Sequence, residues 1–296
     1  MIANLTIIGV GLIGGSLARA LRFAGGCERI TGSGRSEANL QRAVELGVID
    51  DYSTDITEAV AEADVIVACV PLGAMTAVFG KIKAAGKESA IITDVGSSKV
   101  SVLRSAQEAF GKIPQNFIPG HPIAGTEKSG VEASFSELYR NRKIILTPDS
   151  GSSPQALAVV EKMWQQTGAQ VITMDAQHHD KVLAATSHLP HLLAYGIVDT
   201  LANMDDRQEI FEYAAGGFRD FTRIASSDPT MWRDICIHNR DAIIEMMELY
   251  TADMQNLTDL VRNGDKEALF EMFSQAKVVR DRFNDMLNGS FTAQDK

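Results

Sequence analysis

Residues 4–16 read NLTIIGVGLIGGS, and this stretch decides the fold of the N-terminal half. An apolar run typical of a buried strand leads into Gly9-x-Gly11-x-x-Gly14, after which SLARALRFAG predicts a helix. Gly9 allows a tight turn out of the strand, Gly11 lets a pyrophosphate approach the backbone, and Gly14 lets the helix pack closely. The helix N-terminus then offers free N–H groups to phosphates, so the stretch predicts a dinucleotide-binding fold.

The size and charge of the chain exclude several classes of protein. It has 296 residues, 45% of them hydrophobic, which is enough for two domains with a buried core. The formal net charge of −10 argues against nucleic acid or an anionic membrane as a partner. Cys27, Cys69 and Cys236 lack C-x-x-C spacing and are typical of buried thiols in a reducing compartment. No signal peptide or membrane-spanning run is recognisable, so we expect a soluble cytoplasmic protein.

Short β-branched runs alternate with helical patterns through the first half of the chain. This alternation predicts an α/β fold, with a Rossmann-type, doubly wound, mostly parallel sheet covered by helices on both faces. The expected strands cover residues 4–8, 29–33, 64–70, 90–95, 116–119, 143–147 and 169–174. The expected helices cover residues 12–24, 37–46, 57–62, 72–85, 98–110 and 154–167.

The pattern changes near residue 175, after which only helical patterns follow. The expected helices cover residues 175–204, 206–226, 229–263 and 265–288. Their apolar faces need a partner, which predicts packing against the first domain and against a second copy of the chain in a homodimer. We therefore expect a dinucleotide-binding domain over 1–174 and an all-helical substrate and dimerisation domain over 175–296, with a frayed polar end from Gly289.

The end of the second strand bears on the choice of cofactor. Folds that prefer NAD usually place an acidic residue there to bind the ribose 2′-hydroxyl, but this chain reads ITGSGRS with Gly34 at that position. Arg35 can pair with a 2′-phosphate, and the hydroxyls of Ser33 and Ser36 can donate to it. The sequence favours NADP, with NAD as the alternative if Arg35 only stacks on the adenine. The predicted cofactor-binding residues are Gly9, Gly11, Leu12, Ile13, Gly14, Ser33, Arg35, Ser36, Val70 and Pro71.

Polar residues follow two further strands of the predicted sheet. Residues 94–99 read DVGSSK at a strand end, where ligands of open α/β sheets bind. Of Ser97 and Ser98, we expect one to cap the next helix and the other to face the cleft. His121 lies between glycine and proline in PGHPIAGTEKSG, on what we expect to be a rigid loop after a strand. That position favours catalysis over a purely structural histidine.

Two motifs of the helical half also carry polar side chains. SHLPH, at 187–191, places a proline where it would kink a helix and free a carbonyl. Its two histidines could suggest a metal, but apart from Asp180 no cysteine or carboxylate cluster is near, and we expect no metal. In GGFRDFTRI, Arg219 and Arg223 lie four positions apart, which fits either a site for a carboxylate or a solvated face.

Together these motifs resemble the prephenate/arogenate dehydrogenase family, which carries out the oxidative step to tyrosine. GVGLIGGS, TDVGSSK, GHPIAGTEKSG, TSHLPH and GGFRDFTRIASSDPTMW occur in the family's order and spacing over nearly the whole chain. The resemblance implies oxidative decarboxylation of prephenate, arogenate or both, with hydride transfer to NAD or NADP. The small-molecule substrate would be a cyclohexadiene with a ring hydroxyl and a ring carboxylate.

The resemblance also implies roles for individual residues. His121 would take the proton of the ring hydroxyl, and Ser97 would help to hold that hydroxyl, so both are implied as catalytic. Arg223 would bind a substrate carboxylate. The other residues implied to bind substrate are Thr126, His191, Gly216, Trp232 and Asp180. For the proton transfer we expect a neutral imidazole with an ordinary pKa at His121.

Two other functions fit parts of the sequence. A 3-hydroxyacid or imine oxidoreductase has a similar two-domain build, but such enzymes usually carry a catalytic lysine on the first long helix of the second domain. This chain has His188 and His191 there, with Lys181 further back. A non-catalytic NADP-sensing protein would need the dinucleotide fold, but not a histidine and a serine converging at the nicotinamide end.

Overall fold

The computed structural model describes residues 1–287, and its contacts group the chain into two units. The first unit covers Met1–Ile243 and the second begins at Ile244, within helix α12 (Arg240–Asn263). The change of pattern near residue 175 falls inside the first unit, between strand β9 (Gln170–Thr173) and helix α7 (Ala176–Leu183). Residue 288, the expected end of the last helix, and the polar end from Gly289 lie outside the described residues.

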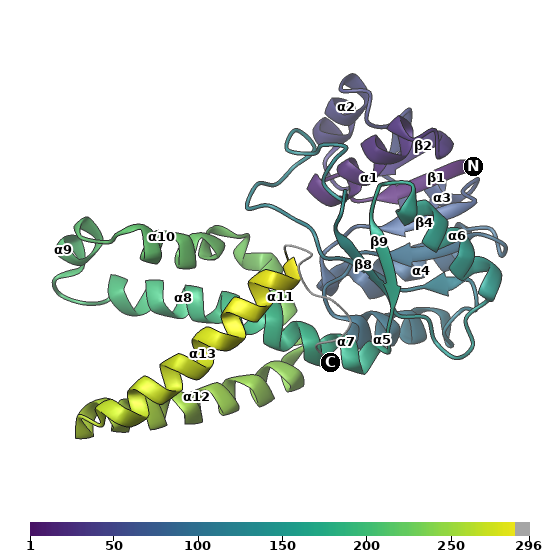
Figure 1. Cartoon of the computed structure of the whole chain (residues 1–296). Helices are drawn as coiled ribbons and strands as arrows, with labels where there is room; N and C mark the ends of the chain where they lie inside the picture. The colour runs from purple at the N-terminus through teal and green to yellow at the C-terminus, as the bar shows by residue number, and fades with distance from the viewer. Residues whose placement is uncertain (288–296) are drawn as a thin grey trace. The chain divides into compact units, whose positions relative to one another are not determined.

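A six-stranded parallel sheet forms the centre of the first unit, in the order β3-β2-β1-β4-β5-β6 (Figure 1). Its strands are β1 (Ile2–Ile8), β2 (Cys27–Ser33), β3 (Asp51–Ser53), β4 (Val65–Ala68), β5 (Ile91–Asp94) and β6 (Phe117–Ile118). This order confirms the predicted doubly wound Rossmann-type fold. Only β3 lacked a sequence signal, because its three residues contain no apolar run.

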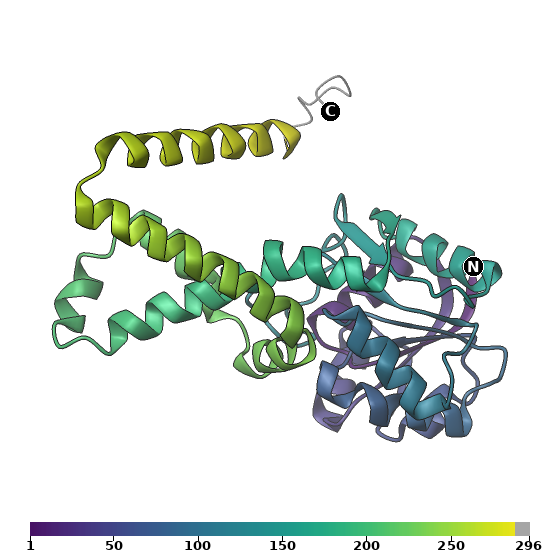
Figure 2. The same cartoon turned by 90° about the horizontal axis from the view of Figure 1, so that it is seen from below.

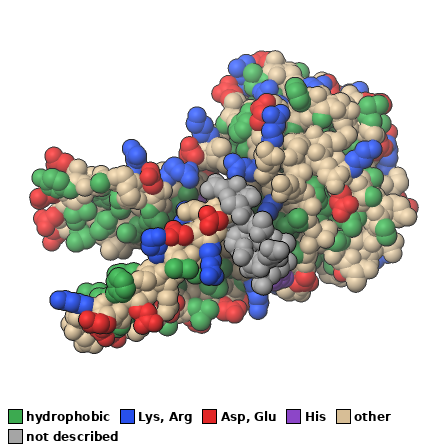
Figure 3. Space-filling view, in the orientation of Figure 1, with side chains coloured by type: hydrophobic (Ala, Val, Ile, Leu, Met, Phe, Trp, Pro, Cys, Tyr) green, Lys and Arg blue, Asp and Glu red, His purple; other side chains and the backbone are tan. Residues whose placement is uncertain are grey.

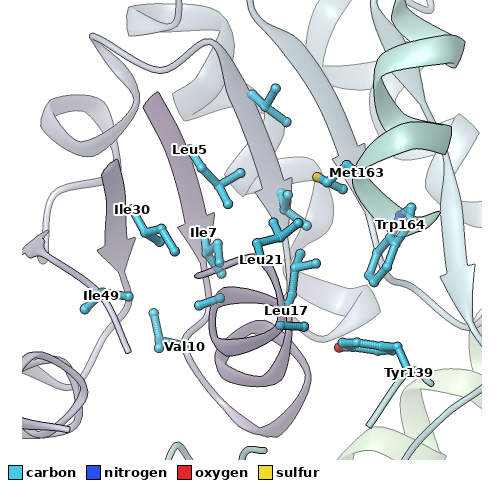
Figure 4. Close-up of a cluster of buried hydrophobic side chains, with 14 of the residues drawn as sticks. Leu5, Ile7, Val10, Leu17, Leu21, Ile30, Ile49, Tyr139, Met163 and Trp164 are labelled. Carbon is cyan, nitrogen blue, oxygen red and sulfur yellow. The ribbon is translucent and has the colours of Figure 1, made fainter. Parts of the chain in front are cut away.

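Helices cover both faces of this sheet, as Figure 2 shows. On one face, α1 (Leu12–Phe23) and α6 (Pro154–Gln165) contribute to the buried cluster of Figure 4, where Leu17 lies near Tyr139 and Trp164. On the other face lie α4 (Met75–Ala85) and α5 (Lys99–Phe110), with the ring centroid of Phe79 5.1 Å from that of Phe117. The shorter helices of this half are α2 (Glu37–Glu45), α3 (Ile56–Val60) and a 3₁₀ turn, Leu72–Ala74.

The strands expected at 143–147 and 169–174 belong to a second sheet. β8 (Lys143–Leu146) and β9 form three strands with β7 (Gly120–Pro122), in the order β7-β8-β9. β7 pairs antiparallel with β8, and β8 pairs parallel with β9. The expectation of one continuous sheet was therefore wrong at its end, and His121 lies on a strand rather than on a loop. Pro119 separates β6 from β7 because a proline cannot donate to a strand ladder.

The helical half is more divided than its apolar pattern predicts. The stretch 175–204 consists of α7, a π-helical segment at Ala184–His188, and α8 (Leu189–Ala202). Pro190 is the second residue of α8, just after the wider π turn, which fits its inability to donate to the preceding turn. The remaining segments are α9 (Arg207–Glu212), α10 (Gly216–Thr222), a 3₁₀ turn at Arg223–Ser226, α11 (Pro229–His238), α12 and α13 (Lys266–Leu287).

Candidate active site

The glycines after β1 shape a site beside the N-terminus of α1. At Gly9 φ is +98°, and an added Cβ would lie 2.1 Å from the carbonyl oxygen of Cys69. At Gly14 an added Cβ would lie 2.3 Å from the carbonyl oxygen of Gly9. Gly11 differs, because an added Cβ there would meet no atom within 4 Å. The open space lies at the first turn of α1, so the backbone here fits a dinucleotide pyrophosphate.

The turn after β2 gives a mixed result for the predicted 2′-phosphate contacts. Ser33 is a correction: its side chain is fully buried, so its hydroxyl is not exposed to a ligand at this turn. Arg35 and Ser36 are exposed, and Ser36 Oγ also accepts a hydrogen bond from the backbone N–H of Asn39 at the start of α2. An added Cβ at Gly34 would have only one side chain near it, Leu40 at 3.7 Å.

The other predicted cofactor residues differ in exposure. Leu12 is buried in the first turn of α1, so its side chain belongs to the core and only its backbone can meet a ligand. Ile13 and Val70 are partly buried, and Pro71 is exposed at the end of β4.

A chain of hydrogen bonds connects β7 with α7. His121 Nδ1 lies 2.9 Å from His179 Nε2, and His179 Nδ1 lies 2.8 Å from Asp180 Oδ1. His121 is partly buried, whereas His179 has no exposed surface. Sequence reasoning missed His179, because the run HHD in a predicted helix does not say which histidine faces the protein. The available signal was helical periodicity: Leu183 lies four residues after His179, so the two side chains share one buried face of the helix.

The Asp180 carboxylate, on α7, accepts hydrogen bonds from the N-terminus of α5. Its Oδ1 accepts a hydrogen bond from the backbone N–H of Lys99 at 2.7 Å, and its Oδ2 accepts one from the N–H of Val100 at 3.0 Å. The Ser98 hydroxyl donates to the same Oδ2 at 3.0 Å. Burial raises the pKa of Asp180, but the hydrogen bonds from His179 and the α5 backbone outweigh it and leave the pKa below its ordinary value.

Two predictions are corrected by this arrangement. Asp180 does not offer a carboxylate to substrate, because it is buried and protein donors occupy both of its oxygens. The expectation that Ser97 or Ser98 caps α5 with its side chain is also wrong. Ser98 is the N-cap residue, but its hydroxyl bonds to Asp180, which supplies the cap instead. Ser97 is partly buried just before this helix.

A buried ion pair fixes the strand that carries His121. Lys99 Nζ lies 2.5 Å from Asp94 Oδ2 and donates to the carbonyl oxygen of Gly120 at 2.6 Å. Asp94 Oδ1 in turn accepts from the N–H of Gly120 at 3.1 Å. Burial lowers the pKa of the Lys99 amine, while Asp94 opposes that shift. The pair therefore holds Gly120, the neighbour of His121, from both sides of its backbone.

The pKa of His121 differs from the expectation of an ordinary value. Burial is the main cause, and the nearby His179, Lys99 and His188 add to it, so the pKa lies well below the ordinary value of about 6.5. A histidine with so low a pKa is neutral at pH 7. It can accept a proton from an alcohol only while the two groups are held close together.

A second group of side chains joins α8 to α11. Asn239 donates from Nδ2 to the backbone carbonyl of Asp180 at 2.9 Å and contacts His188 Nδ1 at 3.1 Å. His188 is buried, and that burial lowers its pKa to about 4. The rings of His191 and Trp232 are stacked, with centroids 3.7 Å apart and planes 22° apart.

His191 has one ring nitrogen left for a ligand. Its Nδ1 lies 2.9 Å from the carbonyl oxygen of Ser187, which can only accept, so Nδ1 carries a proton and Nε2 is the other available atom. Burial lowers the pKa of His191, and the positive charge of Arg223 lowers it further although the Ser187 carbonyl opposes both. The charge of Arg223 is therefore felt at the His191 ring.

The two arginines of the GGFRDFTRI motif do not share a site. Arg219 lies near its neighbour Asp220 at 3.5 Å, whereas Arg223 Nη1 lies 3.6 Å from Glu127 Oε2. They separate because α10 ends at Thr222 and Arg223 begins a 3₁₀ turn, so the helical four-residue spacing is lost. The Arg223 side chain is 63% exposed, which leaves its guanidinium accessible.

The remaining predicted residues lie at the surface. Thr126 is exposed on the loop after β7, and its Oγ1 accepts from the N–H of Lys128 at 3.2 Å. Gly216 is exposed at the first position of α10, which packs against α8. Within residues 1–287, no three histidine, cysteine, aspartate or glutamate side chains gather as a metal site would require.

Models of two protein domains match nearly all of the chain. The prephenate dehydrogenase nucleotide-binding domain matches residues 17–173, and the prephenate dehydrogenase dimerization domain matches residues 175–275. Among characterised proteins, the chain is 39% identical to the cyclohexadienyl dehydrogenase of Zymomonas mobilis, over 94% of both chains. It is 36% identical to the prephenate dehydrogenase of Bacillus subtilis, over 94% of this chain and 75% of that protein.

The solved structures that the chain resembles include prephenate and arogenate dehydrogenases. The crystal structure of prephenate dehydrogenase from A. aeolicus, in complex with hydroxyphenyl propionate and NAD+, has a TM-score of 0.89 at 36% identity. The match covers 96% of this chain and 99% of that one. Synechocystis arogenate dehydrogenase has a TM-score of 0.79 at 26% identity, with 95% and 99% covered.

Proposed function

Because this chain belongs to the prephenate dehydrogenase family, we propose that it oxidatively decarboxylates prephenate, arogenate or both with hydride transfer to NAD or NADP. The resemblance seen in the sequence motifs is thereby confirmed at the level of the family. The observation that carries the proposal is the position of His121, neutral and hydrogen-bonded to His179, on β7 just after the carboxyl end of β6. That position supports the proposal, because ligands of open α/β sheets bind beyond the carboxyl ends of the strands.

The reaction asks the protein to manage one proton and to align two reactants. The bound nicotinamide ring would accept the hydride from the carbon that carries the ring hydroxyl. His121 takes the hydroxyl proton as that carbon becomes carbonyl-like, and the proton returns to the oxygen once loss of CO₂ has made the ring aromatic. A positioned base contributes about 10²–10⁴ in rate. Ser97, two residues before the start of α5, is proposed to hold the same hydroxyl.

Arg223 is the proposed partner of a substrate carboxylate. It is exposed, and its ion pair with Glu127 is long and solvated, so exchanging that partner for a substrate costs little. A guanidinium can hold a carboxylate through two parallel hydrogen bonds. The proposed lining of the substrate site beside it consists of Thr126, His191, Gly216 and Trp232. Of these, His191 and Trp232 hold each other by ring stacking.

The preferred cofactor under this proposal is NADP. Support comes from the exposed Arg35 and Ser36 beside a position without a carboxylate, Gly34. Gly34→Asp tests it, because an added Cβ meets only Leu40, at 3.7 Å, and the backbone there needs no positive φ. The variant should lose affinity for NADP through repulsion of the 2′-phosphate and keep or gain affinity for NAD. Equal affinities for both cofactors in the parent and the variant would contradict the preference.

A homodimer is proposed from the apolar side chains that the helical segments expose. Figure 3 shows hydrophobic side chains gathered over the region of α8 to α10. The exposed members of these segments are Ile197, Met204, Phe211, Tyr213 and Phe221, and those of α13 are Phe270, Phe273, Val278, Val279 and Phe283. Apolar surface of this extent is typical of protein–protein contacts. Sedimentation of the purified protein would test the dimer.

Two coarser assignments complete the proposal. The matched domains meet between residues 173 and 175, which supports a dinucleotide-binding domain over 1–174 and a helical domain over 175–296. The three cysteines are free, which supports a cytoplasmic location. Among residues 1–287, no helix combines the length and apolar character that crossing a bilayer needs.

The decisive experiment is a matrix of both substrates against both cofactors. Purified protein is mixed with prephenate or arogenate and with NAD or NADP, and reduced cofactor is followed by its absorbance. Turnover that disappears in His121→Asn supports the proposal. Cofactor binding without turnover of either substrate would favour an NADP sensor instead, and turnover of 3-hydroxyacids alone would favour the hydroxyacid oxidoreductase.

A further inference from the structure

The hydrogen bonds around His121 determine which of its ring nitrogens carries the proton, as well as where the ring lies. We propose that His179, fixed by Asp180, is a positioning residue that holds His121 in the tautomer whose Nε2 carries the free lone pair. The catalytic consequence of this inference rests on the proposed function, whereas the tautomer itself does not. The argument runs along the hydrogen-bonded chain from Asp180 to His121, one group at a time.

Asp180 is the fixed end of the chain. Its two oxygens receive four donors: the N–H groups of Lys99 and Val100, the hydroxyl of Ser98 and the ring of His179. A carboxylate has about four lone-pair positions, so Asp180 is saturated as an acceptor. It lies at the N-terminus of the twelve-residue helix α5, where the helix dipole favours its negative charge. Asp180 therefore stays ionised and can only accept.

That assignment fixes the tautomer of His179. Because Asp180 Oδ1 accepts, the proton of this 2.8 Å contact lies on His179 Nδ1. His179 has no exposed surface, so a second proton would create a buried cation. Its Nε2 is then unprotonated and accepts a hydrogen bond.

The donor to that nitrogen is His121. The 2.9 Å contact joins His121 Nδ1 to His179 Nε2, so the proton lies on His121 Nδ1. A neutral imidazole carries one N–H, and the Nε2 of His121 must therefore be the basic nitrogen. The ring planes meet at 62°, which places the pair edge to face and leaves the Nε2 side of His121 clear of His179. In the opposite tautomer Nε2 would be a donor and could not take a proton from an alcohol.

Once His121 has taken a proton its Nδ1–H still has an acceptor in His179, although burial and the positive charge of Lys99 keep the pKa of His121 low. Its Nδ1–H then belongs to an imidazolium, and hydrogen bonds from charged donors are stronger than neutral ones. The acceptor is His179, whose own N–H is held by the ionised Asp180. His179 thus passes the effect of the carboxylate to His121 without placing a second negative charge beside the substrate.

The tautomer can be measured without turnover. Protein labelled with ¹⁵N at histidine is examined by NMR through the couplings between ring nitrogens and ring protons, with His121→Asn and His179→Leu assigning the signals. We expect His121 protonated at Nδ1 and unprotonated at Nε2 in the parent protein, and a loss of that single form in His179→Leu. A parent His121 that is protonated at Nε2, or a His179 that carries two protons, would overturn the inference.

Kinetics test the consequence for catalysis. His179→Leu should lower kcat roughly 10- to 100-fold, as removal of a supporting hydrogen bond does, with KM changed less than about threefold. His179→Gln keeps an acceptor at the same reach and should recover most of the loss. His178→Leu is the matched control, because His178 is the neighbouring histidine of the same helix and is exposed. Its kcat should match that of the parent.

A double variant separates positioning from general damage. If His179 acts only through His121, His179→Leu should change the residual rate of His121→Asn by less than about twofold. A full additional loss in that background, or a fall in Tm that accounts for the lost activity, would assign His179 a structural role and overturn the inference. If the parent protein turns over neither substrate, the proposed function fails while the NMR result still decides the tautomer.

Discussion

Asp180, on the first helix of the helical half, accepts the backbone N–H of Lys99, a residue 81 positions earlier in the chain, at 2.7 Å. The cap of α5 is therefore supplied by a different part of the fold rather than by a neighbouring residue. Caps of this kind usually come from the residue just before the helix. Here Ser98 holds that position and instead donates its hydroxyl to the same carboxylate.

Removing this carboxylate should destabilise the first unit strongly. Asp180→Ala leaves two backbone N–H groups and His179 Nδ1 without their acceptor, whereas the Ser98 hydroxyl keeps the carbonyl oxygen of His238, and each orphaned buried donor costs about 1–3 kcal/mol. We expect a loss of at least about 3 kcal/mol in the free energy of unfolding, measured in urea. Asp175→Ala is the control, since Asp175 is an exposed cap of α7 worth about 1 kcal/mol. Equal losses in the two variants would contradict this account.

His188 should make the protein sensitive to acid. Its pKa is about 4 in the folded protein and about 6.5 in the unfolded chain, so the unfolded state binds more protons between these values. The stabilising effect is fully present above pH 6.5 and is lost as the pH falls toward 4, by at most about 1.4 kcal/mol per pH unit. His188→Asn, which keeps an acceptor near Asn239, should reduce the slope of unfolding free energy against pH over this range. An unchanged slope would remove His188 as its source.

The kinetic roles of His121 and Arg223 should separate. His121→Asn removes the base but little binding surface, so kcat should fall about 10²–10⁴-fold with little change in KM. Steady-state rates at saturating cofactor measure both parameters. A variant that retained most of kcat would show that another group takes the proton.

Arg223→Ala should mainly raise KM. The guanidinium is exposed and is assigned to binding, and an interaction equally strong in the ground and transition states does not change kcat. Glu127→Gln is the matched control, because it removes the same ion pair and leaves the guanidinium in place. Its KM should not rise. Equal losses in kcat and kcat/KM for Arg223→Ala would place the arginine in the transition state instead.

Two glycines of the first turn should respond differently to the same substitution. Gly9→Ala forces a Cβ to within 2.1 Å of a backbone oxygen at a positive φ, so Tm should drop sharply or the protein should not fold. Gly11→Ala meets no protein atom within 4 Å, so Tm should stay within a few degrees. Its affinity for the cofactor, followed by fluorescence, should nevertheless fall because the methyl group occupies the path of the pyrophosphate. Unchanged cofactor affinity in Gly11→Ala would place the phosphates elsewhere.

Local patterns in the sequence were enough to predict the central sheet. The glycine turn and the β-branched runs are formed by residues close together in the chain, and β1, β2, β4 and β5 lie where the apolar runs indicate. β3 and β7 were not predicted because three residues carry too little periodicity. The second sheet depends on Pro119, which ends one strand and lets the next leave the plane.

The candidate site was less accessible to sequence reasoning. His121 stands out because of its glycine and proline neighbours, but its depressed pKa depends on burial that a single segment does not reveal. Asp180 was expected near a ligand, and only the tertiary structure shows that α5 uses both of its oxygens. Arg219 and Arg223 share a helical spacing in the sequence, yet the switch to a 3₁₀ turn sends them to different partners.

The hydrogen bonds between Asp180 and the start of α5 make the nucleotide-binding half of the first unit depend on the helix that follows it. The glycine turn and His121 both lie before residue 175, so that segment carries the proposed phosphate-binding backbone and the proposed base. Without α7, this segment would have no carboxylate at the N-terminus of α5. It would also have no side chain to fix which ring nitrogen of His121 is basic. The helical half therefore contributes to the arrangement of the proposed base as well as enlarging the molecule.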